Sequence, residues 1–257
     1  MLIAAVSTVV FAVAVWLLVI NTPGWARVQD SFFDPETAVA AFPRVAEGFL
    51  TNLRILGYAV VGVAIFGTLL AFLRTLRGPV FFPLRTLATG YTDLFRGIPL
   101  IIVLYLVGFA IPGLLDVRIP KELLGTVALV LTYSAYVSEV IRAGIEGVHP
   151  SQRLAARALG LSHAKTLRLV VLPQAIRKQA PALMNDFVSM QKDVGLVSIL
   201  GAVDAIRGAQ IETAKFADFT PYVVAAVLFV LLAIPTIRLA DWVTARLRRR
   251  EQMGSIV

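Results

Sequence analysis

Six polar or ionisable residues lie inside two otherwise apolar stretches of the chain, where side chains of these types are energetically unfavourable. They are Glu139, Asn185, Asp186, Ser189, Lys192 and Asp193. Asn185, Ser189 and Lys192 are spaced i, i+4, i+7, so on a helix they would form one polar face. Because adjacent residues differ by about 100° around a helix axis, Asp193 would lie to the flank of that face, with Asp186 and Ser189.

These residues allow several kinds of chemistry. Glu139 and Arg142 could form an ion pair or an anchor at the membrane interface. Lys192 and Asp193 could likewise form a buried pair that only orders the helices. Alternatively, all six residues line a translocation route for a polar solute, with the polar face at its centre. A further possibility is that Glu139, Asp186 and Asp193 are the acid and base groups of a membrane-embedded enzyme.

The composition indicates a membrane protein. Hydrophobic residues make up 58% of the chain, against about 45–50% in a soluble domain, and the mean hydropathy is +0.81. The net charge of +8 fits the basic cytoplasmic segments of membrane proteins, and we expect no nucleic-acid partner. The absence of cysteine excludes disulfides and thiolate metal sites, and two histidines alone cannot build a usual zinc site.

Six apolar runs are long enough to cross about 30 Å of hydrocarbon as helices. The runs are continuous and too long for the alternating strands of a barrel. We therefore expect an all-α integral membrane protein with about six transmembrane helices, near residues 2–20, 49–73, 94–115, 122–143, 183–203 and 220–240.

The first run favours a retained span over a secretory signal, since it lacks a basic start and a small-x-small cleavage site before Asn21. An acidic segment follows it. In that segment Asp34 precedes Pro35, a pair typical of a helix start, and we expect a short surface helix there. This N-terminal helix and extracytoplasmic segment would occupy residues 1–46.

The basic residues predict the orientation. They gather after the second span, between the fourth and fifth spans, and at the end of the chain, so these segments should be cytoplasmic. The intervening segments have mixed or acidic charge. Both termini would then be cytoplasmic, with a tail at residues 247–257.

One cytoplasmic segment, residues 154–176, reads LAARALGLSHAKTLRLVVLPQAI. Pro150 suits a first helical turn, Gly160 suits a left-handed C-terminal cap, and Ser162 can cap a second helix. Pro173 should interrupt that second helix. On these grounds alone the segment could be a helical hairpin that lies on the bilayer and binds anionic lipid.

A second motif is Arg96, Gly97, Ile98 and Pro99, at the start of the third run. Gly followed two residues later by Pro bends or breaks a helix, and an arginine there can reach the interface. The motif could be only a membrane-entry turn.

The string AARALGLS, with VVLPQAIR after it, resembles the cytoplasmic EAA loop of type I ABC importer permeases. The similarity extends over about 200 of the 257 residues, from Glu47 to Arg246. YTDLFRGIPLIIVLYL, SAYVSEVIRAGIEGV, PALMND and QKDVGLVSIL resemble the polar amino acid branch, which includes histidine, arginine, glutamine and glutamate permeases.

This resemblance implies a core of five helices plus an N-terminal helix, in a transmembrane domain at residues 47–246. It implies a coupling helix within a loop at about residues 144–180 that contacts the ATPase. The implied coupling residues are Leu154, Ala155, Ala156, Gly160, Leu161 and Pro173.

The chain departs from the family pattern at three places. Leu154 replaces the usual Glu, so no ion pair to the ATPase carries over from this position. Ser151 replaces a Gly. Val194 and Gly195 replace the Thr and Ser of the family's KDTSL string.

The chain contains no GxxxxGK[ST] phosphate loop and no HExxH or GxSxG motif. The resemblance therefore implies a transport subunit, not an enzyme, which binds no cofactor or metal itself while ATP and Mg bind a separate ATPase. The implied partners are two ATPase subunits, a second permease copy or paralogue, an extracytoplasmic substrate-binding protein and a polar amino acid, at a prokaryotic cell membrane. The alternatives are the membrane-embedded enzyme and a stand-alone secondary carrier, whose inverted repeats are not visible here.

Overall fold

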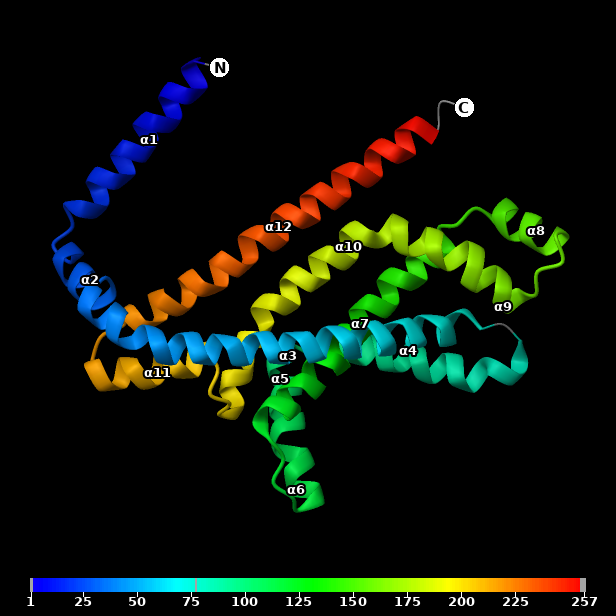
Figure 1. Cartoon of the computed structure of the whole chain (residues 1–257), viewed down its shortest axis with the longest axis horizontal. Helices are drawn as coiled ribbons and strands as arrows, with labels where there is room; N and C mark the ends of the chain where they lie inside the picture. Colours follow the sequence, from blue (N-terminus) through cyan, green and yellow to red (C-terminus); the bar gives the residue numbers. More distant parts are fainter. Residues whose placement is uncertain (1, 77, 255–257) are drawn as a thin grey trace.

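The computed structural model describes residues 2–76 and 78–254, and within these ranges the chain is helical, without β-strands (Figure 1). Short turns and single π or 3-10 segments separate the α-helices. In chain order the elements are α1 (Leu2–Ile20), α2 (Trp25–Phe32), α3 (Pro35–Thr75), η1 (Pro79–Phe81), α4 (Phe82–Gly97), α5 (Leu100–Tyr105), η2 (Leu106–Ala110), α6 (Ile111–Leu115), α7 (Lys121–Glu146), α8 (Pro150–Ala158), α9 (His163–Thr166), η3 (Leu167–Val171), α10 (Leu172–Asp193), η4 (Val194–Leu200), α11 (Ala205–Phe216) and α12 (Thr220–Gly254).

The described helices provide four to six membrane spans, in agreement with the all-α membrane architecture expected from the sequence. α1, α3 together with α2, α7, and α12 are each long and apolar enough to cross a bilayer. Two further spans are bent. α4 meets the α5–α6 segment at 107°, and the segment from α9 to η4 meets α11 at 53°.

The third span shows why one of these bends forms. Ile98 has extended backbone angles, φ −96° and ψ 129°, between Gly97 at the end of α4 and Pro99 at the start of α5. A proline disfavours the helical conformation of the residue before it and supplies no N–H to continue the ladder. The expected bend is therefore confirmed, but α4 begins at Phe82, about twelve residues before the expected start of this span, where the sequence indicated only a basic connection.

The short surface helix expected at Asp34 is wrong. Asp34 does cap a helix, because its carboxylate accepts hydrogen bonds from the backbone N–H groups of Glu36 and Thr37 at 3.2 and 3.1 Å. That helix is α3, which continues for 41 residues and passes through Pro43 without ending. At 1.5 Å per residue it is about 60 Å long, roughly twice the hydrocarbon thickness, so α3 extends well beyond the bilayer.

The core forms where α3 packs against α7, with α10, η4 and the α5–α6 segment around them. Small residues allow the close approach of α3 and α7. A Cβ on Gly62 would lie 2.6 Å from Val130 Cγ2, and one on Gly67 would lie 2.9 Å from Val137 Cγ1. Glycine at such positions is typical of membrane helix pairs, because dispersion contacts and not water expulsion hold them together.

A buried polar link joins α3 to the bend before α11. The Asn52 amide donates to Val194 O at 3.2 Å and to Asp204 Oδ2 at 3.1 Å, and its oxygen accepts from Ala205 N at 3.0 Å. Asp204 is fully buried and caps α11 by accepting from Arg207 N at 2.9 Å. This link holds the start of α11 against α3.

The elements divide between two ends of the molecule (Figure 1). α8 and α9 lie near the last turns of α3 and α7, whereas α2 and α11 lie at the opposite end. α1 projects away from the other helices, and apolar side chains such as Ile3 and Phe11 are exposed around it. A helix that is apolar on every side is suited to a lipid environment.

Candidate functional site

α8, Gly160 and α9 form a compact, tightly capped element. Pro150 occupies the first position of α8, and the N–H groups of Gly160 and Leu161 return to the carbonyls of Arg157 and Ala156. Gly160 has φ +80°, and the Ser162 side chain accepts from Lys165 N at 3.3 Å. The helix start, the left-handed cap and the second cap predicted from the sequence are all confirmed.

The two faces of α8 differ in their contacts. Ala156 is buried in α8, which packs against α9 and η3, whereas Leu154 is 69% exposed and Ala155 is also exposed. Leu159, which the sequence did not single out, is 83% exposed beside them, and Leu161 is half-buried. Exposed apolar residues on a short basic helix form a surface that can bind another protein.

Pro173 does not interrupt the second helix, and that expectation is wrong. α9, η3 and α10 form one continuous helical segment, with Pro173 exposed in the first turn of α10. The π turn η3 lies immediately before it, at Leu167–Val171. The wider π turn accommodates the proline ring and its missing N–H without ending the helix.

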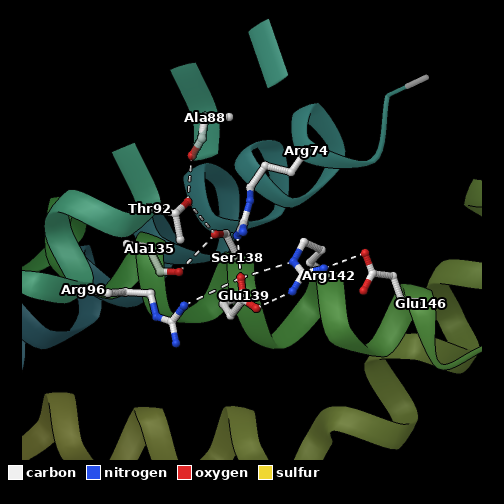
Figure 2. A network of polar contacts seen from close by, with 9 residues as sticks. All are labelled: Arg74, Ala88, Thr92, Arg96, Ala135, Ser138, Glu139, Arg142 and Glu146. Atoms are coloured by element: carbon white, nitrogen blue, oxygen red, sulfur yellow. Dashed lines mark hydrogen bonds and ion pairs between the residues drawn. The ribbon is translucent and has the colours of Figure 1, made fainter. Parts of the chain in front are cut away.

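Glu139 is surrounded by three arginines from three helices (Figure 2). Its carboxylate lies 2.7 Å from Arg74 of α3, 2.5 Å from Arg142 of α7 and 3.8 Å from Arg96 of α4. Arg142 also contacts Glu146 at 2.5 Å. The sequence offered a pair with Arg142 as one of two possibilities but missed Arg74 and Arg96, because no local pattern relates α3 or α4 to α7.

A hydroxyl contact supports this cluster. Thr92 of α4 and Ser138 of α7 are both buried, and their oxygens lie 3.3 Å apart (Figure 2). The Arg96, Gly97 and Pro99 motif thus has two parts in the structure: Arg96 faces Glu139, and Gly97 and Pro99 form the bend.

The polar residues of α10 separate into two groups. Asn185, Ser189 and Lys192 are exposed on one face of the helix, as the spacing predicted. Lys192 makes no ion pair with any residue that the structure describes, Asp193 included. Instead Asp193 accepts a hydrogen bond from the Tyr133 hydroxyl at 2.7 Å.

Asp186 points away from the exposed face. It lines a cavity of about 290 Å³ with Tyr133 and Phe187, and its buried Oδ2 has no hydrogen-bond partner among the described residues. Gln191 is 1% exposed, and neither polar atom of its amide is bonded within that part of the chain. Buried polar atoms are rarely left without a hydrogen-bond partner in folded proteins.

Comparisons with known proteins relate this helical membrane chain to transport proteins. Residues 64–249 match the family model of the binding-protein-dependent transport system inner membrane component. The arginine transport system permease protein ArtQ of Bacillus subtilis (strain 168) is 34% identical over 203 residues, which cover 78% of this chain and 91% of ArtQ. The glutamate/aspartate import permease protein GltK of Escherichia coli O157:H7 is 33% identical over 208 residues, covering 75% and 92%.

Solved structures give the same result. A crystal structure of an amino acid ABC transporter with histidines matches with a TM-score of 0.74 and 32% identity, covering 83% of this chain and 98% of the other. A chain of the MetNI methionine ABC transporter, in an inward-facing conformation, shares the fold with a TM-score of 0.62 and 19% identity.

Proposed function

This chain belongs to the binding-protein-dependent transport system inner membrane components, and on that premise we propose which of its surfaces carry out import. It is a permease subunit of an ABC importer, a multi-pass protein of the bacterial inner membrane and not an enzyme. Family membership implies an ATPase and a substrate-binding protein as partners. The division of the chain at residues 47 and 246 stays a prediction.

The ATPase contact would be the exposed side of α8. Leu154, Ala155 and Leu159 form its apolar part, while Ala156 is buried and Gly160 provides the left-handed turn between α8 and α9. Leu154 in place of the family's Glu makes this contact one of apolar packing instead of an ion pair. The element lies beside the ends of α3 and α7, so a movement of α8 would be transmitted directly to the membrane helices (Figure 1).

The substrate route would follow the exposed face of α10. Asn185, Ser189 and Lys192 supply hydrogen-bonding groups and a positive charge on a surface that no described residue covers. Two permease subunits, either copies or paralogues, would place two such faces opposite each other. A polar amino acid suits the face, because Lys192 can attract its carboxylate, and the relatives' names refer to arginine, glutamine and glutamate/aspartate.

The motion would be alternating access. ATP and Mg bound by two ATPase subunits would bring the two α8 elements together, and the membrane helices would open outward; hydrolysis would reverse this change. Nucleotide and substrate can shift this equilibrium only by their different affinities for the two states. Both termini would be cytoplasmic.

The exposed apolar side of α8 is the observation that carries this proposal, and co-purification tests it. Leu159→Asp should remove most of the ATPase that co-purifies with the permease, because a carboxylate would be buried against an apolar surface. Val117→Asp, an exposed residue in the connection before α7, is the matched control and should retain it. Normal recovery of ATPase with Leu159→Asp would show that α8 is not the contact.

A further inference from the structure

A polar pocket of about 180 Å³ lies where α3, α4, α7 and the α8–α9 element meet. It differs from the cavity beside α10, since its lining is rich in cationic side chains. The polar residues that line it are Arg74, Thr75, Arg85, Glu146, Arg153 and His163.

Positive charge exceeds negative charge around this pocket. Arg74, Arg96 and Arg142 already share the two carboxylates of Glu139 and Glu146. Arg85 and Arg153 have no carboxylate partner among residues 2–76 and 78–254. They donate only to the backbone carbonyls of Leu76 and Ile145.

The pocket also contains unused hydrogen-bond donors. The Arg74 side chain is 8% exposed, and its Nε is buried without a partner in the described chain. The Nε of Arg153 is likewise buried without a hydrogen-bond partner in the described chain. Buried donors are rarely left unpaired, and guanidinium groups bind phosphate oxygens with several hydrogen bonds at once.

An exposed apolar surface adjoins the pocket. Val80, Phe82 and Leu84, which directly precede Arg85, are 82%, 56% and 47% exposed. The Arg85 guanidinium lies over the Phe82 ring at 5.7 Å. A soluble anion has no apolar part that could contact this surface, whereas the acyl chains of a lipid would cover it.

We propose that this pocket binds the phosphate of an anionic phospholipid, with the acyl chains along Val80, Phe82 and Leu84. Basic pockets between helices at the cytoplasmic side of a membrane are suited to such headgroups. The bound phosphate would contact α3, α4 and α8 together. Anionic lipid would therefore stabilise the junction between the membrane helices and the α8–α9 element.

Lipid retention by the purified complex tests the site. The complex is placed in phosphatidylcholine nanodiscs with added phosphatidylglycerol, and native mass spectrometry measures the phosphatidylglycerol that remains bound. Arg85→Gln should weaken retention about fivefold, because Arg85 would contact the bound phosphate directly and one basic contact to an anionic headgroup contributes about this factor to binding. Arg85→Lys keeps the charge and should keep most of the retention. Arg168→Gln is the control, because Arg168 is exposed on neighbouring η3 but does not line the pocket.

Three results would overturn the site. Equal retention by Arg85→Gln and Arg168→Gln would show that the lipid binds elsewhere. Displacement of phosphatidylglycerol by millimolar inorganic phosphate would assign the pocket to a soluble anion. If Arg85→Gln loses the ATPase but retains phosphatidylglycerol unchanged, the pocket would instead bind a carboxylate of the ATPase. Retention is measured without transport, so failure of the proposed import function would leave this result standing.

Discussion

Arg74 of α3 places Nη1 2.7 Å from Oε2 of Glu139 in α7, and this ion pair joins the two helices that form most of the core. Arg142 and Arg96 approach the same carboxylate, so Glu139 attracts guanidinium groups from three helices. Its charge therefore organises the contact between α3, α4 and α7 (Figure 2).

Glu139→Gln should lower the stability of the assembled protein by about 1.5–3 kcal/mol, because charged hydrogen bonds are lost and three arginines then repel one another. Unfolding of the purified complex, followed by fluorescence, measures this change. Glu146→Gln is the control: its side chain is 61% exposed and contacts one arginine, so the loss should be below about 1 kcal/mol. Similar losses in the two variants would contradict a central role for Glu139.

Gly160→Val should uncouple ATP hydrolysis from uptake while the complex still assembles. Nothing lies within 4 Å of a Cβ at this position, so the penalty comes from φ +80° and should be about 1–2 kcal/mol. Gly160→Asn should behave nearly as the native protein, since asparagine tolerates left-handed backbone. Substrate-stimulated ATPase activity and uptake in proteoliposomes measure the effect. If both Gly160→Val and Gly160→Pro keep ATP hydrolysis fully coupled to uptake, Gly160 has no role in coupling.

Lys192→Met should lower uptake with little change in stability, because the side chain is exposed and makes no ion pair among the described residues. Asp193→Asn should weaken the contact with Tyr133 and cost stability as well. The effects of the two changes on unfolding should add in the double variant, since the side chains are not paired. Recovery of stability in the double variant would instead indicate a structural pair, and unchanged uptake in all three would remove both residues from the route.

Asn52→Ala should destabilise the protein by about 2–4 kcal/mol, because it breaks three hydrogen bonds and leaves the buried Asp204 carboxylate with fewer partners. Asn185→Ala is the matched control. Asn185 is exposed, so its removal should change the free energy of unfolding by less than about 0.5 kcal/mol. Thermal unfolding of the two variants compares them directly.

Cysteine labelling can test the orientation cleanly, because the chain has no native cysteine. In intact cells a membrane-impermeant reagent should label Val117→Cys and not Lys165→Cys, both of which replace exposed residues. Ser255→Cys should also resist external labelling, although this position lies outside the described residues. External labelling of Lys165→Cys would show that the topology is the reverse of the one proposed.

The sequence by itself determined the features that depend on neighbouring residues. Apolar run length identified the membrane spans, and Pro150, Gly160 and Ser162 predicted the caps of α8 and α9, because caps depend on the backbone within one turn. The spacing of Asn185, Ser189 and Lys192 likewise predicted a shared face, because helical geometry alone sets it.

Only the tertiary structure decided how distant residues pair. Arg74 meets Glu139, Tyr133 meets Asp193, and Asn52 meets Asp204 because packing sets the rotation and depth of each helix, and no local period contains that information. The tertiary structure also decided the length of α3 and the continuity of the helical segment through Pro173. A local breaker signal gives a tendency, and the packed helices and an adjoining π turn can override it.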